Sequence, residues 1–83
     1  MKVRLRYFAQ LRETIGVSEE VFDTLAQDVA GLRTELMARG GAHAEALAAN
    51  KAIRCAINQQ LCDASTRLSE GAEVAFFPPV TGG

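Results

Sequence analysis

The sequence predicts one small α+β domain in which a mixed sheet packs on a single main helix. The chain has 83 residues, 48% of them apolar, and a chain of this length builds one hydrophobic core rather than several. Apolar residues alternate with polar ones near both ends of the chain, and between these ends they follow the spacing of a helix. Strands that flank one helix in the sequence are typical of a sheet wrapped over that helix.

The first strand is predicted over residues 2–8, where apolar and charged side chains alternate. This alternation gives a buried face and a charged outer face, with Val3, Leu5 and Tyr7 inside and Lys2, Arg4 and Arg6 outside. A short helical turn is predicted over residues 9–16, and it ends at a glycine. Residues 17–24 predict a second strand, which is weaker because acidic residues interrupt its pattern.

The main helix is predicted from an N-cap at Asp28 to about Arg39, with Val29, Leu32 and Leu36 on one face. The glycines at positions 40 and 41 end this helix. The alanine-rich residues 42–50 predict a short second helix.

Three further strands are predicted over residues 52–58, about 60–63 and 73–77. A turn over residues 69–71 precedes the last strand, and Pro78-Pro79 ends it because proline lacks the N–H that a sheet ladder needs. If the first and last strands pair in parallel at the centre of the sheet, the fold is a β-grasp.

Composition excludes several classes of function. Nine Lys and Arg against ten Asp and Glu give a net charge of −1, whereas a dedicated nucleic-acid-binding domain carries a basic excess. Two cysteines and one histidine are too few for a disulfide scaffold or a four-ligand zinc site. The alternating, charged N-terminus is neither a signal peptide nor a membrane span. We therefore expect a cytoplasmic protein with no metal, nucleic-acid or membrane partner.

The spacing of the polar residues does not predict a catalytic centre within the chain. No serine, histidine and aspartate are spaced as a nucleophile, a base and an orienting group. We interpret His43 as a surface residue of the short second helix. The chain alone is therefore not expected to be a complete enzyme.

The C-terminus calls for a functional explanation. Packing does not explain Thr81-Gly82-Gly83, because terminal glycines add no side chains to a core. Two glycines can, however, thread a narrow channel and bring a terminal carboxylate to another protein's active site. Pro78-Pro79 would act as a stiff spacer, and the six residues after Phe77 extend over roughly 20 Å. We therefore expect a domain over residues 1–77 and a flexible, extended tail over residues 78–83.

Three segments of the chain have a distinctive sequence, namely GAEVAFFPPVTGG (71–83), FAQLRE (8–13) and INQQL (57–61). With these segments the sequence closely resembles, from end to end, the small, sulfur-carrying subunits of molybdopterin synthase, a ubiquitin-like β-grasp family. Residues 40–52 match poorly, so no role is assigned to them. The sequence departs from the family at Ala72, where relatives often carry an acidic residue.

The resemblance implies that all the chemistry passes through Gly83. An adenylyltransferase similar to the ubiquitin-activating enzymes would use ATP to adenylate the terminal carboxylate. A desulfurase or rhodanese-like protein would supply the sulfur that converts it to a thiocarboxylate. The large catalytic subunit of the synthase would take up the tail, which consists of Pro78, Pro79, Val80, Thr81 and Gly82 ahead of Gly83.

Inside the large subunit, the resemblance implies that the sulfur passes to cyclic pyranopterin monophosphate. This transfer forms the dithiolene of molybdopterin in molybdenum cofactor biosynthesis. Two small and two large subunits would assemble as a heterotetramer. The small subunit would bind no permanent cofactor.

A two-residue turn at Asn58-Gln59 fixes the register of a predicted hairpin. We interpret its two cysteines as small buried hydrophobes; a disulfide between them is geometrically feasible but disfavoured in a reducing cytosol. An ion pair between Arg54 and Asp63 is expected at the end of the hairpin away from the turn. The register pairs Arg54 with Asp63, Cys55 with Cys62, and Ala56 with Leu61.

The same alternation leaves three large apolar residues on the outer face of the sheet, namely Phe8, Leu61 and Phe77. A monomer does not need so much exposed apolar surface, and the resemblance implies that these positions contact the large subunit. The basic residues Arg4, Arg6 and Arg54 would surround them. The alternative, that twist at the strand ends returns one or two of the three to the core, stays open.

Two other classes of function also stay open. The chain could be another ubiquitin-like sulfur carrier, such as the thiamine-pathway carrier, or a ubiquitin-like protein modifier. The segment FFPPVT before the terminal glycines favours molybdopterin synthase over these. A non-catalytic interaction domain, in which the two glycines are incidental, is the second alternative.

Overall fold

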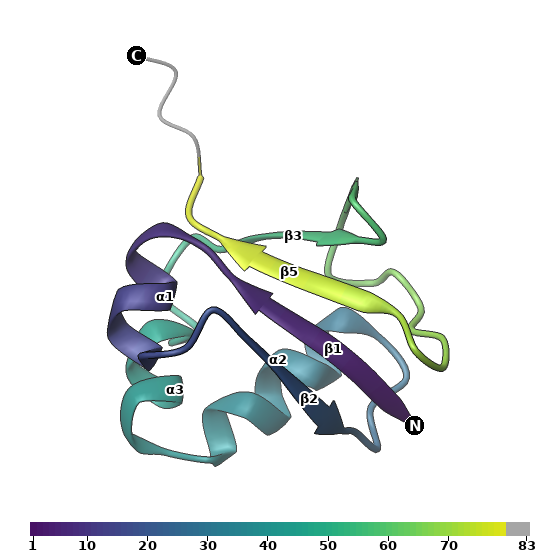
Figure 1. Ribbon diagram of the computed structural model, residues 1–83, viewed down its shortest axis with the longest axis horizontal. Coiled ribbons are helices and arrows are strands. Elements are labelled where there is room, and N and C mark those ends of the chain that lie inside the picture. Colours follow the sequence, from purple (N-terminus) through teal and green to yellow (C-terminus); the bar gives the residue numbers. More distant parts are fainter. Residues whose placement is uncertain (80–83) are drawn as a thin grey trace.

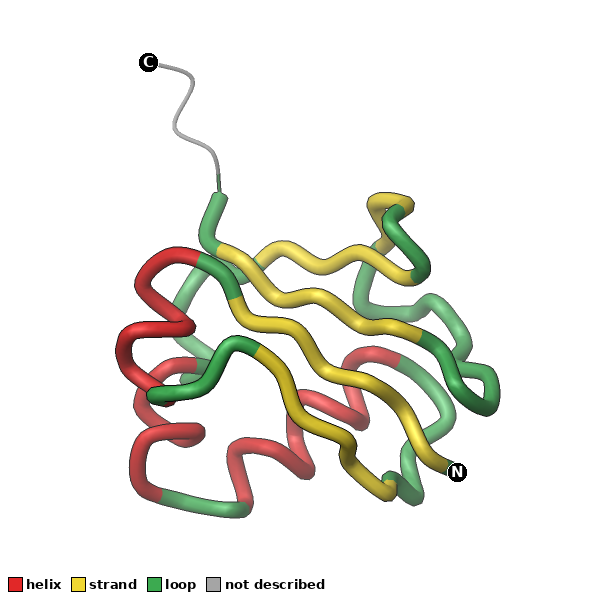
Figure 2. Tube along the Cα trace, in the orientation of Figure 1, coloured by secondary structure: helices red, strands yellow, loops and turns green. Residues whose placement is uncertain are grey.

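The architecture is a five-stranded mixed sheet with helices on one side (Figures 1 and 2). The computed structural model describes residues 1–79. The elements follow the order β1 (Lys2–Tyr7), α1 (Ala9–Ile15), β2 (Glu19–Asp23), α2 (Val29–Ala38), α3 (Gly41–Ala46), β3 (Arg54–Ile57), β4 (Gln60–Cys62) and β5 (Glu73–Phe77). The helix α2 crosses one face of the sheet, and α1 and α3 pack together near the end of the sheet where β1 and β5 finish (Figure 1).

The strand order β2-β1-β5-β3-β4 confirms the predicted β-grasp. The central strands β1 and β5 are parallel, and Leu5 lies opposite Val74. All other neighbouring strands are antiparallel. Because β1 and β5 come from opposite ends of the chain, the centre of the sheet depends on contacts between residues far apart in the sequence.

The core lies between the sheet and the helices. The alternation predicted for β1 is confirmed, since Val3, Leu5 and Tyr7 are all at most 1% exposed. The buried residues that meet them come from β5 and from α2, namely Val74, Phe76, Val29, Leu32 and Leu36. The side chain of Asp28 accepts a hydrogen bond from the backbone N–H of Gly31 at 2.8 Å, as expected for the N-cap of α2.

The predicted second helix over residues 42–50 is too long, because α3 ends at Ala46. The guanidinium group of Arg33, on α2, explains how the chain continues. It donates hydrogen bonds to the carbonyl oxygens of Leu47, Ala48 and Lys51 at 2.8, 2.5 and 3.0 Å. The carbonyl oxygen of Ala48 also accepts from the backbone N–H of Lys51 at 2.9 Å, so the chain continues after α3 as a turn held by Arg33 and not as a longer helix.

The hairpin β3–β4 has the predicted two-residue turn, with Asn58 and Gln59 both in the left-handed region at φ 50° and 70°. Neither residue is glycine, so the turn needs support from outside. Glu73 gives this support: its backbone N–H donates to Asn58 Oδ1 at 3.1 Å, and its carbonyl accepts from Asn58 N at 2.9 Å. The neighbouring strand β5 therefore holds the turn in place.

Glu20 lies on the helix-facing side of β2, where an apolar residue would follow the pattern. Its carboxylate accepts hydrogen bonds from Tyr7 Oη at 2.8 Å, from Arg39 Nη1 at 2.9 Å and from His43 Nε2 at 2.9 Å. The prediction that His43 is a surface residue is wrong, because its side chain is 15% exposed. This carboxylate ties β1, β2, the end of α2 and α3 together.

We expect Glu20→Gln to lower the free energy of unfolding by about 1–3 kcal/mol at pH 7, because three donors lose a charged acceptor. Burial alone would raise the pKa of Glu20, but the hydrogen bonds from His43, Arg39 and Tyr7 outweigh it and hold this pKa below its usual 4.5. A carboxyl group with a lowered pKa stabilises the fold at neutral pH and loses this contribution as the pH falls.

Urea unfolding of both proteins as a function of pH tests this expectation. The stability difference should be constant near neutral pH and shrink as the pH falls below the ordinary value of 4.5. Glu19→Gln is the matched control, because the neighbouring Glu19 side chain is 71% exposed. Equal losses for the two variants would contradict the role given to Glu20.

Candidate functional site

The candidate site begins on the sheet face that points away from the helices, which we call the open face. The register places on it the residues that alternate with the core positions of each strand. A row runs across three strands, from Ala75 on β5 through Ala56 on β3 to Leu61 on β4. Phe77 lies two residues beyond Ala75 on β5. Because side chains alternate along a strand, Phe77 is on the same face as Ala75.

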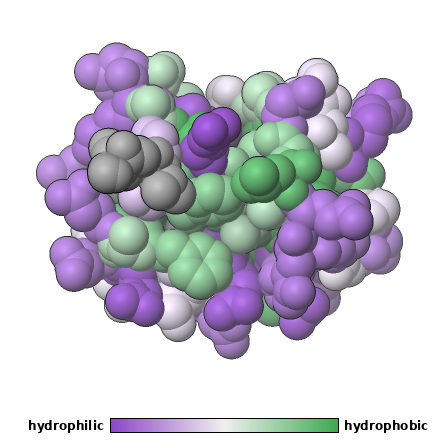
Figure 3. Space-filling view, turned by 90° about the horizontal axis from the view of Figure 1, so that it is seen from above, coloured by the Kyte–Doolittle hydropathy of each residue, from purple (hydrophilic) through white to green (hydrophobic). Residues whose placement is uncertain are grey.

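The three large apolar residues predicted to face outward lie on this side of the sheet. Leu61 is 76% exposed and Phe8 is 38% exposed. Phe77 is half-buried rather than fully exposed. Figure 3 shows apolar side chains gathered on the side of the molecule from which the chain leaves β5, with hydrophilic side chains around them. The structure therefore gives the predicted residues one shared surface.

The basic residues at the edge of this surface are partly neutralised. Glu73 lies 3.7 Å from Arg4 and 4.0 Å from Arg6, and its side chain is only 14% exposed. The guanidinium carbon of Arg6 lies 5.1 Å from the ring centroid of Phe8, a cation–π distance. Glu73 was absent from the predicted site, although the parallel register of β1 and β5 places it directly opposite Arg4.

The predicted ion pair between Arg54 and Asp63 is wrong, although the other two pairs of the hairpin register are confirmed. The strand β4 ends at Cys62, so Asp63 lies outside the ladder. Its carboxylate accepts hydrogen bonds from the hydroxyl and N–H groups of Ser65, at 2.6 and 2.9 Å, which hold the pKa of Asp63 below its usual range. Within residues 1–79, Arg54 forms no ion pair with any carboxylate.

The chain leaves the sheet at the end of the central strand β5. The N–H of Phe8 donates to the carbonyl oxygen of Phe76 at 3.2 Å, one residue before the strand ends. Pro78 is then half-buried and Pro79 is exposed. The other predicted tail residues, Val80, Thr81, Gly82 and Gly83, lie outside the described residues.

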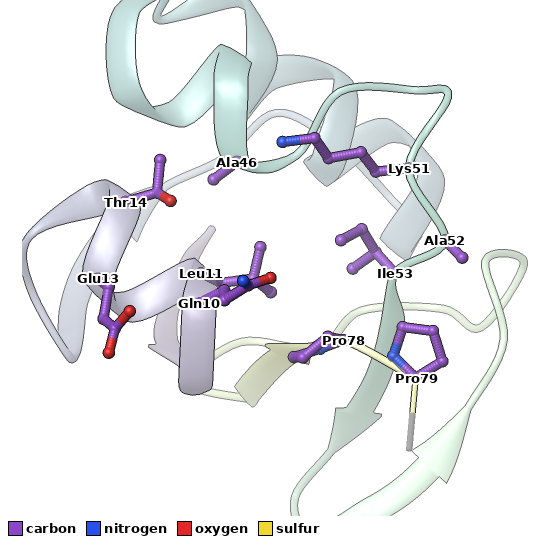
Figure 4. A pocket seen from close by; sticks show the side chains of 10 residues that line it. All are labelled: Gln10, Leu11, Glu13, Thr14, Ala46, Lys51, Ala52, Ile53, Pro78 and Pro79. Carbon is purple, nitrogen blue, oxygen red and sulfur yellow. The ribbon is translucent and has the colours of Figure 1, made fainter. Parts of the chain in front are cut away.

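A cavity of about 490 Å³ opens beside the two prolines (Figure 4). Its apolar lining includes Leu11 of α1 and Ile53 ahead of β3, whose side chains point toward each other in Figure 4. Lys51 and Glu13 add one charge of each sign at the edge. The sequence patterns gave no sign of this cavity, because it forms where segments distant in the sequence meet.

The described part of the chain has no feature of a metal site or a membrane span. Among residues 1–79, no three His, Cys, Asp or Glu side chains come together as metal ligands. None of the described helices combines the length and the apolar character needed to cross a bilayer. An apolar surface, a basic edge and the end of β5 lie together on the open face, and this arrangement supports recognition of a partner.

Comparison with known proteins gives one family match, to the ThiS family over residues 5–83. The chain is 38% identical to the molybdopterin synthase sulfur carrier subunit of Escherichia coli (strain K12), over 98% of the chain and 99% of that protein. It is 40% identical to the protein of the same name from Haemophilus influenzae, over 93% of the chain and 94% of that protein.

Solved structures with the same fold come from several organisms. The putative molybdopterin converting factor subunit 1 of Pyrococcus furiosus has a TM-score of 0.79 at 26% identity, with 96% of this chain and 99% of that chain covered. SAMP1 of Haloferax volcanii has a TM-score of 0.77 at 25% identity, with both chains fully covered. A protein–protein complex of subunits 1 and 2 of molybdopterin-converting factor from Helicobacter pylori has a TM-score of 0.68 at 28% identity, again with both chains fully covered.

Proposed function

Because the chain belongs to the ThiS family, we propose that it is the sulfur-carrying small subunit of a molybdopterin synthase. The observation that carries the proposal is the place where the chain leaves the domain. The central strand β5 ends at Phe77 on the open face, and Pro78-Pro79 and Val-Thr-Gly-Gly follow at once. A partner that covers the open face therefore also lies beside the origin of the tail. The two bacterial sulfur carrier subunits that the chain resembles support the same function.

The proposed chemistry takes place at the terminal carboxylate of Gly83. A carboxylate is a poor electrophile, so an adenylyltransferase similar to the ubiquitin-activating enzymes joins it to AMP from ATP, with loss of pyrophosphate. The outer sulfur of a persulfide on a desulfurase or rhodanese-like protein then attacks the adenylate and displaces AMP. A thiol reductant cleaves the S–S bond of the resulting acyl disulfide and leaves the thiocarboxylate. This chain contributes the carboxylate and the surfaces that partners bind, and the partners contribute the catalytic groups.

In this proposal the thiocarboxylate delivers its sulfur to cyclic pyranopterin monophosphate inside the large subunit, in an assembly of two small and two large subunits. Phe8, Leu61 and Phe77 bind the large subunit, and Pro78 to Gly82 enter it. The similar Helicobacter pylori structure is a complex of subunits 1 and 2, which supports such a partner. The exposed apolar side chains and the unpaired Arg54, among the described residues, favour a partner surface that is apolar with acidic groups at its edge.

A second candidate is a protein modifier joined to other proteins through Gly83. The likeness to SAMP1, a small archaeal modifier protein, favours it. Both candidates need the same activated C-terminus, but they differ in the product. A sulfur carrier ends as a free thiocarboxylate, whereas a modifier ends in an amide bond to a lysine of another protein.

The intact mass of the protein purified from its native host tests the proposal. We expect a species in which one oxygen is replaced by sulfur, and we expect this species to bind the large subunit. A chain without Gly83 is the control and should have only its unmodified mass. Covalent adducts with other proteins in place of the sulfur-containing species would favour the modifier, and a wholly unmodified chain in cells that make molybdopterin would overturn both candidates.

A further inference from the structure

Cys55 and Cys62 are the two cysteines of the chain, and they lie opposite each other on β3 and β4. Their Sγ atoms are 3.2 Å apart, and both thiols are free. Directly opposed residues of antiparallel strands have Cα atoms about 4.5–5.5 Å apart. A disulfide accepts Cα separations of about 4.4–6.8 Å. The backbone of this hairpin can therefore accept a disulfide with little movement.

The pair can be reached from outside the domain. Both cysteines line a cavity of about 270 Å³ between the hairpin and α2. Cys62 is half-buried, whereas Cys55 is 8% exposed. Arg33 also lines this cavity, and its three hydrogen bonds to backbone carbonyls hold its cation in place. Because Cys62 is the more exposed of the two, we expect a small oxidant to react first with its sulfur.

We propose that Cys55 and Cys62 form a reversible oxidation site, which a peroxide closes to a cross-strand disulfide. In the first step the sulfur of Cys62 attacks one peroxide oxygen, the O–O bond breaks, and water leaves as Cys62 becomes a sulfenic acid. In the second step the sulfur of Cys55 attacks the sulfur of Cys62. The S–O bond breaks and the hydroxyl leaves as water with the proton of Cys55. Two thiols are oxidised to one disulfide, and one hydrogen peroxide is reduced to two waters.

The surroundings make the reaction slow at neutral pH. Burial, then the contact with Cys62 and then the carboxylate of Asp63 raise the pKa of Cys55, and the Arg33 cation opposes the rise; together they bring this pKa to about 12. Because thiolates are the reactive species, the site responds to sustained exposure to oxidant. A dithiol reductant restores both thiols by exchange.

The disulfide would constrain one edge of the sheet. The three-residue strand β4 is at the edge of the sheet and pairs only with β3. The next pair along the hairpin joins Ala56 to Leu61, on the open face. A covalent bond behind this pair fixes the position of Leu61 relative to β3. The oxidation site itself does not depend on the proposed sulfur-carrier function.

The experiment uses the reduced, full-length protein and hydrogen peroxide at pH 8.5, with intact mass and thiol alkylation as readouts. We expect the loss of two hydrogens, the loss of both alkylatable thiols, and recovery of both after dithiothreitol. We also expect the melting temperature of the oxidised form to rise by several degrees, because the bond restricts the unfolded chain. Persistence of two free thiols, or disulfides between chains only, would overturn the proposal.

A pair of variants separates the geometry of the site from general thiol reactivity. Cys62→Ser leaves one thiol, and it should give no intramolecular disulfide. Cys62→Ser combined with Leu61→Cys restores two thiols in nearly the same sequence but puts them on opposite faces of the sheet. We expect no disulfide within this chain either. Equally fast closure in this variant and in the unchanged protein would show that the register does not direct the reaction.

Discussion

Deletion of Gly83 is expected to abolish molybdopterin formation and to leave the domain folded. In the proposed mechanism every step uses the terminal carboxylate of this residue, so a shortened chain retains no partial route. The core residues lie between Val3 and Phe76, well before the deleted position. We therefore expect a loss of more than about a hundredfold in product, roughly 3 kcal/mol or more in barrier terms. The melting temperature should be unchanged.

A reconstituted assay with the activating enzyme, the sulfur donor and the large subunit measures molybdopterin formation. Thermal unfolding measures the melting temperature. The matched control carries a removable extension after Gly83. It should be inactive before the extension is cleaved and active after cleavage has exposed Gly83 again. Normal molybdopterin production by the blocked or shortened chain would refute the sulfur-carrier proposal.

Substitution of the two adjacent phenylalanines is expected to affect two different properties. Phe76 is 1% exposed and stacks on Tyr7 with ring centroids 6.5 Å apart, so Phe76→Ala should lower the free energy of unfolding by about 3–5 kcal/mol. Phe77 lies on the open face and is half-buried. Phe77→Ala should cost about 1 kcal/mol of stability but about 2 kcal/mol or more of binding to the large subunit.

For each variant, denaturant unfolding of the free protein measures the free energy of unfolding, and titration with the large subunit measures the free energy of binding. Phe76→Ala is the internal standard, because it shows what loss of a core ring does to stability in the same strand. A large loss of stability for Phe77→Ala with unchanged binding would place Phe77 in the core. The open face would then lose its assignment as the docking surface.

The strands and helices could be predicted because their signals are local, whereas the parallel pairing of β1 with β5 was expected from the family resemblance. The alternation in β1, the N-cap at Asp28 and the prolines after β5 each decide the structure of a few neighbouring residues. The register of the hairpin also followed from the sequence, because a two-residue turn allows only the register in which Cys55 lies opposite Cys62. These signals together fixed which side chains of the strands face the helices.

The polar contacts could not be predicted in the same way, because their partners are far apart in the sequence. Glu20 breaks the alternation of β2, and only the folded chain brings Arg39 and His43 to its carboxylate. The path of the chain after α3 likewise depends on Arg33, which lies more than a dozen residues earlier. No local pattern carries such information.

The predicted ion pair between Arg54 and Asp63 does not form, because a residue close to Asp63 in the sequence donates hydrogen bonds to its carboxylate instead. An exposed ion pair contributes about 0–1 kcal/mol, and it must hold two flexible side chains in one geometry. The hydrogen bonds from Ser65 reach Asp63 within two residues and also form the turn that leads away from β4. The local turn therefore prevails, and Arg54 stays available on the open face.

The parallel pairing of β1 with β5 has a mechanical consequence if a partner holds the C-terminus, as the proposed function requires. Tension on the tail runs along β5, which β1 and β3 flank on its two sides (Figure 1). Ladder hydrogen bonds lie across the strand direction rather than along it, so such a force loads them together in shear. A strand at the edge of the sheet, pulled sideways, would instead lose its bonds one after another. The domain can therefore resist traction on its tail without unravelling from that end.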